Sequence, residues 1–250
     1  MPKRDLVFQN PMMNGAGALG FAPDLRGPVP WAELGAFITN PISLRSRRAA
    51  AAPALLEFQG GFLLHTGLPN PGFRSVIRQY ARRWKDAPMP VIVHLLADRP
   101  DETRRMVQAL EGAENVMAVE LGFAPLLAGD IILLVVEMCS GELPLIVSLP
   151  AEQVLELGSR ALQSGAAALS IAPPRGAISR DGALVTGRLF GPSLLPRTLD
   201  VVHSAAHSGF PVIGAGGICS KADTDAMLAA GALAVQVDSA LWLPRALPQE

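Results

Sequence analysis

Hydrophobic positions in this chain gather in short unbroken runs that recur along almost its whole length. Many of the runs follow a proline or a glycine, and they contain few polar residues. Such runs are typical of strands that are buried on both faces of a parallel sheet. The pattern predicts eight strands, at residues 9–15, 35–39, 90–96, 116–121, 144–149, 167–172, 210–215 and 233–238.

Stretches with helical periodicity alternate with the last seven of these strands. Four of the stretches end within a residue or two of a glycine, the usual stop of a helix. The longest apolar run, IILLVV at residues 131–136, is too short to cross a bilayer and predicts a buried helix. The other expected helices fall within residues 75–84, 101–112, 151–165, 195–209 and 221–231.

Eight strands with helical crossovers in 250 residues favour a closed barrel of alternating strands and helices. An α/β chain of this length typically closes into a (β/α)8 barrel, the TIM barrel, and an open doubly wound sheet is the alternative. No shift in composition marks a boundary, so we expect a single barrel domain over residues 1–250. Two connections, residues 40–72 and 173–191, follow the second and sixth strands and are long enough to predict lids over a site.

The composition limits the kinds of molecule that the protein is expected to bind. The net charge of −1 and a pI near 6.4 give no basic field for nucleic acid, and no segment predicts a membrane span. The first residues lack the apolar core of a secretion signal. Cys139 and Cys219 lie far apart and fit no metal or redox spacing, so we expect reduced thiols in a cytoplasmic protein.

The stretch PVIGAGGICS places glycines between the seventh strand and a helix. Gly214 lies near the end of that strand, Gly216 and Gly217 follow it, and residues 238–240 follow the eighth. The loops after these two strands form the usual phosphate site of the barrel, because glycines let backbone N–H groups approach an anion near a helix N-terminus. The expected partner is therefore a small anionic or phosphate-bearing ligand, while association into a homo-oligomer stays open.

Histidines near the expected site allow two interpretations. His65 and His94 lie near the carboxyl ends of the strands, where they would act as a general acid pair or serve as structural side chains. His203 and His207 are four residues apart on an expected helix, a spacing that suits a metal pair as well as a solvated face.

Arginines are concentrated in the two long connections, where they would bind an anionic ligand or reflect composition alone. Of the 21 Lys and Arg residues only Lys3, Lys85 and Lys221 are lysines, and of these Lys221 alone follows a strand end where it could approach a ligand. The arginines of the two connections are Arg45, Arg47, Arg48, Arg175, Arg180 and Arg188.

Several segments, in order along the chain, resemble the dihydroorotate dehydrogenase family. The clearest are GLPNPG and VIGAGGI with AVQV, and the resemblance implies a TIM barrel that binds flavin mononucleotide (FMN) and oxidises dihydroorotate to orotate. The segments that carry it are NPMMNGAGALG, GAFITNPISL, EFQGGFLLHTGLPNPG, PLIVSLP, TGRLFGPSLLPRTL, VIGAGGI and AGALAVQVDSAL.

The positions that the resemblance makes catalytic are occupied by other residue types. It implies a lysine at the end of the second strand and another on the fifth, where this chain has Asn40 and Ser148. It places the base within residues 122–125, which offer no hydroxyl or titratable group that could take a proton. The polar residues implied for substrate binding are replaced by Leu64, Gly122, Pro173 and Pro174.

The positions that the resemblance assigns to the cofactor match the family pattern better than the catalytic positions do. Asp238 is the exception, because it stands where the family usually has glycine. Its carboxylate would repel a phosphate at about 4 Å by roughly 1–4 kcal/mol, or it would turn away and cap a helix that begins at Ser239. The cofactor-binding residues implied by the resemblance are Ala16, Gly17, Asn40, Ser148, Gly191, Gly216, Gly217, Asp238 and Ser239.

Two functions follow from this mixture of kept and replaced positions. The first is an FMN-type oxidoreductase scaffold in which the orotate chemistry is lost or altered. The alternative is a non-catalytic barrel that serves in assembly or ligand sensing.

Overall fold

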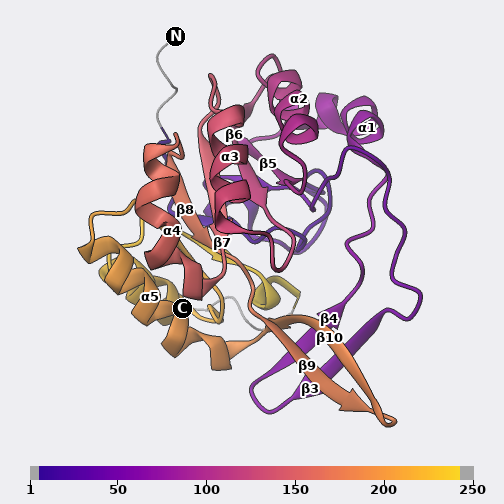
Figure 1. The fold of residues 1–250 in the computed structure, drawn as a ribbon, viewed down its shortest axis with the longest axis vertical. Coiled ribbons are helices and arrows are strands. Elements are labelled where there is room, and N and C mark those ends of the chain that lie inside the picture. Colours follow the sequence, from indigo (N-terminus) through magenta and orange to yellow (C-terminus); the bar gives the residue numbers. More distant parts are fainter. Residues whose placement is uncertain (1–5, 243–250) are drawn as a thin grey trace.

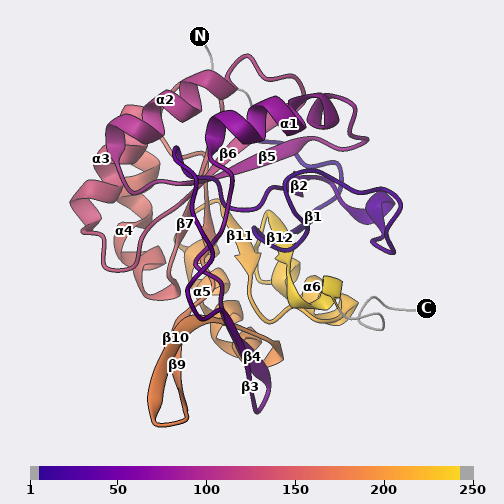
Figure 2. The same cartoon turned by 90° about the vertical axis from the view of Figure 1, so that its right-hand side faces the viewer.

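Eight parallel strands form a barrel in the computed structural model, which describes residues 6–242 (Figures 1 and 2). Their order around the barrel is β1-β12-β11-β8-β7-β6-β5-β2. All eight predicted strands are confirmed, and the open-sheet alternative is wrong. The strands are β1 (Met12–Asn14), β2 (Phe37–Ile38), β5 (Val91–Leu96), β6 (Val116–Gly122), β7 (Leu145–Leu149), β8 (Ala168–Ile171), β11 (Val212–Ala215) and β12 (Ala234–Val237).

The barrel closes between its two shortest strands, β1 and β2. Their backbones meet in a single parallel bridge, between Met13 and Ala36. The fully buried side chain of Asn14 adds two bonds beside it. Its amide nitrogen donates to the Ile38 carbonyl at 2.7 Å, and its amide oxygen accepts from the Ile38 N–H at 2.9 Å. A side-chain amide thus completes the ladder where the strands are too short to do so.

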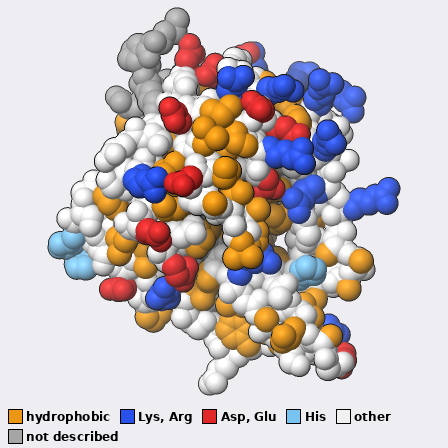
Figure 3. All heavy atoms as spheres, in the orientation of Figure 1, with side chains coloured by type: hydrophobic (Ala, Val, Ile, Leu, Met, Phe, Trp, Pro, Cys, Tyr) orange, Lys and Arg blue, Asp and Glu red, His pale blue; other side chains and the backbone are white. Residues whose placement is uncertain are grey.

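Helices cover the outside of the barrel (Figure 2), and all five predicted from periodicity are confirmed. The run at residues 131–136 is also helical, but Ile131 and Leu134 are 37% and 42% exposed, so that helix is only partly buried. Hydrophobic side chains lie on the outer surface over this helix (Figure 3). The helices are α1 (Phe73–Lys85), α2 (Pro100–Leu110), α3 (Gly129–Cys139), α4 (Ala151–Gln163), α5 (Leu195–His207) and α6 (Lys221–Ala229), with 3₁₀ turns η1 (Trp31–Glu33), η2 (Pro192–Leu194) and η3 (Ser239–Trp242).

Two hydrophobic layers hold the barrel together. The larger layer lies between the strands and the helices and includes Trp84, which is fully buried. The smaller layer fills the barrel interior with one residue from each of the eight strands and with Ala36 beside β2, because alternate strand residues point to opposite faces. Its members are Met13, Ala36, Ile38, Ile92, Ala118, Ile146, Ala168, Ile213 and Ala234.

The two long connections form a second sheet rather than irregular loops. Four antiparallel strands, in the order β3-β4-β10-β9, make an arm that projects from the barrel (Figure 1). Because β4 pairs with β10, the connections after the second and sixth barrel strands are joined in one structure. We call these strands the hairpin arm: β3 (Ala54–Phe58), β4 (Gly61–His65), β9 (Arg175–Arg180) and β10 (Ala183–Phe190).

Gly191 joins the hairpin arm to the barrel. Its φ is +123°, a conformation that L side chains rarely adopt, and a methyl group there would overlap the Cα of Gly61 and the carbonyl oxygen of Gly60. This glycine is therefore required by packing, whatever its relation to a cofactor. In the part of the chain that the structure describes, no helix is both long enough and apolar enough to span a membrane.

We expect Gly191→Ala to lower the free energy of unfolding by more than about 2 kcal/mol, since it adds backbone strain and steric overlap. Gly182→Ala is the matched control, because Gly182 also has a positive φ, +78°, but meets nothing within 4 Å and should cost only about 1 kcal/mol. Urea unfolding of both variants measures the difference. Equal losses would show that overlap with Gly61 does not matter.

Candidate functional site

Polar side chains occupy one level of the barrel interior, above the apolar layer. Each lies two residues beyond an interior apolar residue of its own strand, so it faces the same side of the sheet nearer the carboxyl end. This level is where TIM barrels bind their ligands. The residues that form it, all buried, are His94, Glu120, Ser148, Ser170 and Gln236.

Glu120 is the centre of this level and is 1% exposed. One carboxylate oxygen accepts from the Ser170 hydroxyl at 2.7 Å and from the Gln236 amide at 2.6 Å, and the other bonds His94 Nδ1 at 2.7 Å. Burial alone raises the pKa of Glu120. The hydrogen bond and charge of His94, with the bonds from Ser170 and Gln236, outweigh burial, so the pKa lies below its ordinary value.

His94 is oriented by this carboxylate. Because an ionised carboxylate only accepts hydrogen bonds, Nδ1 carries a proton, and in the neutral form of the imidazole the lone pair is therefore on Nε2. Nε2 is buried and has no partner among the described residues. It stands over Gly122, in the space that a side chain at residue 122 would fill. The absence of a side chain at Gly122 therefore makes room for the imidazole.

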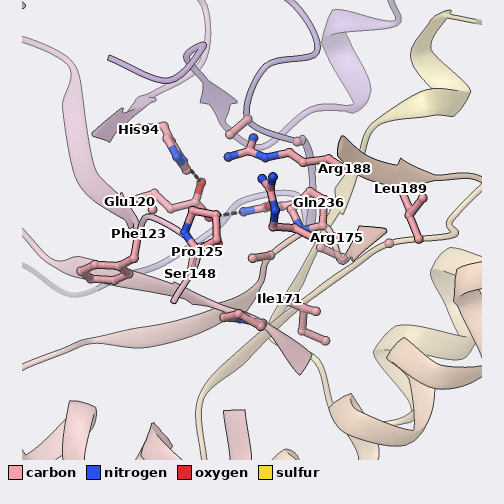
Figure 4. Close-up of a pocket in the computed structure, with 18 of the residues that line it drawn as sticks. His94, Glu120, Phe123, Pro125, Ser148, Ile171, Arg175, Arg188, Leu189 and Gln236 are labelled. Carbon is pink, nitrogen blue, oxygen red and sulfur yellow. Dashed lines mark hydrogen bonds and ion pairs between the residues drawn. The ribbon is translucent and has the colours of Figure 1, made fainter. Parts of the chain in front are cut away.

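A cavity of about 110 Å³ lies above this network (Figure 4). His94, Glu120 and Ser148 line its floor together with residues 122–125. A second cavity of about 430 Å³ adjoins it between the barrel and the hairpin arm. The two share several lining residues, namely Ala16, Phe123, Ala124, Pro125, Arg175, Arg188, Phe190 and Asp238.

The structure brings most of the predicted site residues around these two cavities. Ser148, Gly216 and His94 line the inner one, and Gly17, Asn40 and His65 line the outer one. His65 and His94 thus face different cavities rather than forming a pair. Ala16 and Asp238 line both cavities, whereas Gly191, Gly217 and Ser239 line neither of the two.

Asn40 holds the loop after β1. Its side-chain oxygen accepts from the Gly20 N–H at 3.0 Å, and its backbone N–H donates to the Gly20 carbonyl at 2.7 Å. The side chain at this strand end is therefore neutral and committed to the backbone. A lysine here, as the resemblance implies, would instead present a charge to the ligand.

The glycine loop after β11 has free donors. Gly217 and Ile218 are buried, yet neither makes a hydrogen bond with any residue between 6 and 242. The Ser239 hydroxyl is also buried without a partner in that part of the chain. Buried backbone N–H groups almost always have an acceptor, so this cluster fits an anion such as a phosphate. Gly216 serves the fold as well, because Thr198 donates to its carbonyl at 2.8 Å.

Asp238 combines the two behaviours that the sequence left open. Its carboxylate accepts from the Ser239 N–H at the start of η3, yet it also lines both cavities. Burial raises its pKa, against the effect of the hydrogen bond from the Ser239 backbone N–H. A second carboxylate lies behind the glycine loop, where Asp223 accepts from the Cys219 N–H at 2.9 Å. Both charges oppose an anion in the glycine loop.

Among the basic residues, the structure separates those that reach the site from those that do not. Lys221 forms an ion pair with Asp225 at 2.6 Å on the surface of α6 and lines neither cavity, so the expectation that it approaches a ligand is wrong. Arg47, Arg175 and Arg188 line a cavity, while Arg45, Arg48 and Arg180 line neither.

His203 and His207 lie on the exposed face of α5, where His207 Nδ1 bonds the His203 carbonyl at 3.0 Å. Within the described residues, no group of three or more His, Cys, Asp or Glu could hold a metal ion. Burial raises the pKa of the free thiol of Cys139 to about 12, so this cysteine is not a nucleophile at neutral pH.

A parallel eight-stranded barrel with its cavities at the carboxyl ends of the strands is a TIM barrel with a ligand site in the usual place. The dihydroorotate dehydrogenase family model matches residues 4–125, and the nitronate monooxygenase family model matches residues 180–245. The catalytic subunit of dihydroorotate dehydrogenase B (NAD(+)) from Trichlorobacter lovleyi is 30% identical over 267 residues, covering 98% of this chain and 88% of the relative. The chain therefore belongs to the dihydroorotate dehydrogenase family.

Other similar proteins agree with this assignment. A putative dihydroorotate dehydrogenase A (fumarate) from Aquifex aeolicus is 26% identical, covering 93% of this chain and 84% of that protein. The crystal structure of dihydroorotate dehydrogenase in complex with ferulenol from Eimeria tenella superposes with a TM-score of 0.73. It covers 96% of this chain and 79% of that one at 17% identity, so it shows the fold alone.

We expect Asp238→Asn to stabilise the protein at neutral pH. Because the pKa of Asp238 is raised in the folded state, its charge opposes folding above that pKa, by about 1.4 kcal/mol per unit of pKa difference. The advantage of the variant should vanish as the pH falls through the folded pKa and the carboxyl takes up its proton. Urea unfolding between pH 4 and 8 measures this.

Asp181→Asn is the control for that experiment, since the Asp181 side chain is 92% exposed on the hairpin arm. It should show no such pH-dependent gain. If the free energy of unfolding of wild type and of Asp238→Asn changed with pH in parallel, the charge of Asp238 would not destabilise the folded protein.

Proposed function

We propose that this chain is an FMN-type oxidoreductase barrel of its family in which oxidation of dihydroorotate is lost or altered. The observation that supports it most directly is His94, whose unpartnered Nε2 occupies the space over Gly122. The loop at residues 122–125, where the resemblance implies the base, has no group that takes a proton. The only imidazole lining the inner cavity lies beside it, on a different strand.

The residues present fit FMN at its phosphate end. The N–H groups of Gly217 and Ile218 and the hydroxyl of Ser239 would hold the phosphate, with Ala16 and Gly17 beside the ring. When bound, FMN supplies a hydride acceptor. The ring end offers no lysine, because Asn40 and Ser148 stand at both positions, so negative charge on a reduced ring would lack the cationic stabilisation that the resemblance implies.

His94 would handle the proton in the altered reaction. An imidazole held by a buried carboxylate through Nδ1, with Nε2 free toward a cavity, has the arrangement of an oriented general base. Glu120 fixes the tautomer and stabilises the imidazolium that forms when Nε2 takes a proton. Such a base is available for a substrate whose acidic C–H or N–H faces β5 rather than the loop after β6.

Dihydroorotate is a poor ligand for this cavity. Leu64, Gly122, Pro173 and Pro174 have no side-chain group that could hydrogen-bond the carboxylate and amide groups that the resemblance implies are bound at these positions. A buried polar group without a hydrogen-bond partner costs about 1–3 kcal/mol, so each polar group of dihydroorotate that lacks a partner in the cavity weakens binding. We propose that one barrel domain over residues 1–250 carries this altered site.

The alternative function is a non-catalytic barrel used in assembly or ligand sensing. One observation favours it: the carboxylate of Glu120 is fully satisfied by three partners, so the network is also able to stabilise the barrel without chemistry. A protein of this kind would bind its ligand and show no turnover with any acceptor.

We expect purified protein saturated with FMN to oxidise dihydroorotate more slowly than about 0.1 per second. Loss of a positioned base costs about 10² to 10⁴ in rate against an ordinary turnover near 10 per second, and the other losses need not multiply with it. Flavin bleaching and orotate formation with several electron acceptors measure the rate, with the Trichlorobacter lovleyi relative as the positive control. Turnover near one per second would overturn the proposal, and His94→Ala and His65→Ala would then identify the base.

We expect Asp238→Gly to bind FMN at least about fivefold more tightly than wild type, because it removes a carboxylate beside the phosphate donors. Ser239→Ala should change affinity in the opposite direction by a similar factor, since it removes a hydroxyl donor. Titration of apoprotein with FMN, followed by flavin fluorescence, measures both. An unchanged affinity in Asp238→Gly would show that the carboxylate is not the obstacle.

A further inference from the structure

Two arginines of the hairpin arm face each other at the barrel mouth. Arg175 on β9 and Arg188 on β10 are directly opposite in the antiparallel register. Both line the inner and the outer cavity, and their guanidinium groups point toward the cluster of Glu120, His94 and Gln236 (Figure 4). Arg188 is half-buried, whereas Arg175 is more exposed at the rim.

Neither guanidinium has a carboxylate partner among residues 6–242. Other arginines of the two connections do have one: Arg47 lies 4.0 Å from Asp98, and Arg180 lies 3.7 Å from Asp181. Like charges directly opposite on paired strands destabilise a sheet. The pKa of Arg188 is lowered by burial and further by the charges of Arg175 and Arg47. The pair is therefore a source of repulsion in the ligand-free protein.

The carboxylates near the pair do not neutralise it. Glu120 raises the pKa of Arg188 slightly, but its oxygens are already engaged by His94, Ser170 and Gln236. Asp238 also lines both cavities, but its carboxylate accepts from the Ser239 N–H and forms no ion pair with either arginine. Among the described residues, the two guanidinium groups at the mouth of the inner cavity thus lack a direct carboxylate partner.

We propose that Arg175 and Arg188 bind the oxyanion group, a carboxylate or a phosphate, of a small acidic ligand. Paired guanidinium groups offer several N–H donors in planes that match such groups. The inner cavity, at about 110 Å³, is smaller than pockets that hold drug-sized ligands, whereas the outer one, at about 430 Å³, falls in their range. The oxyanion therefore sits at the junction of the two cavities, between the two arginines, with the ligand body in the outer cavity.

This site is separate from the glycine loop after β11. The loop offers backbone N–H groups and a hydroxyl, while the hairpin arm offers two side-chain cations. This oxyanion site defines the class of ligand that binds at the barrel mouth. It rests on the proposed function only for the reaction that the bound ligand would undergo. Binding of the oxyanion does not require FMN, so the two are testable apart.

Thermal unfolding and calorimetric titration of the FMN-free protein with malonate and with inorganic phosphate test the site. We expect wild type to bind at least one of the two anions. Arg175→Gln, Arg188→Gln and the double variant should each weaken that binding about 10- to 100-fold, the loss of a charge-assisted hydrogen bond. The double variant should also melt at the same or a higher temperature than wild type without ligand, because like-charge repulsion is removed.

Arg180→Gln, on the same hairpin but outside both cavities, is the matched control and should bind anions as wild type does. Ser239→Ala separates the two sites, because it should weaken phosphate only where phosphate binds at the glycine loop. Malonate binding that exceeds phosphate binding points to a carboxylate ligand, and the reverse order points to a phosphate.

Three results would overturn the proposal. They are no binding of either anion by wild type, binding that survives in the double variant, or a double variant that melts well below wild type, which would make the arginines structural. Failure of FMN to bind, with anion binding intact, would count against the proposed function alone.

Discussion

The barrel interior is organised around one buried carboxylate. An ionised carboxylate removed from water is costly unless hydrogen bonds and an opposite charge compensate it, and Glu120 obtains these from three other strands. The requirement fixes the side chains of His94, Ser170 and Gln236 at one level of the barrel. It also fixes which imidazole nitrogen faces the cavity. The orientation of the His94 imidazole at the barrel mouth therefore follows from the hydrogen bonds that the buried carboxylate requires.

The same requirement accounts for a pair of changes relative to the family pattern. The imidazole of His94 is able to stand above β6 because Gly122 has no side chain. A functional group thus lies on β5, beside a loop that has none of its own. At the opposite side of the mouth, unpaired N–H groups and guanidinium groups both offer donors to anions, while the lysines implied by the resemblance are absent. The donors that the mouth offers to an anion therefore come from other residues than those that the resemblance implies.

Much of the fold could be predicted from the sequence because parallel barrel strands are local apolar runs with clear stops. The hairpin arm could not, since pairing of β4 with β10 joins segments far apart in the chain and leaves no periodic signal. Glu120, Ser170 and Gln236 were missed, although a signal exists: several apolar strands carry one polar residue at the same depth. The free donors of Gly217 and Ile218 depend on loop geometry, which composition does not report.

The hairpin arm gives the mouth of the barrel a stability of its own. The residues of β9 are all exposed or half-buried, and β3 and β9 are sheet edges, whereas Leu63 on β4 is fully buried and Phe62 and Phe190 pack against Trp242. Segments with few buried contacts open at a free energy well below that of global unfolding. The outer strands of the arm therefore open more readily than its base, while the eight-stranded core stays intact. A ligand that bridges the arm and the core would in turn hold that opening closed.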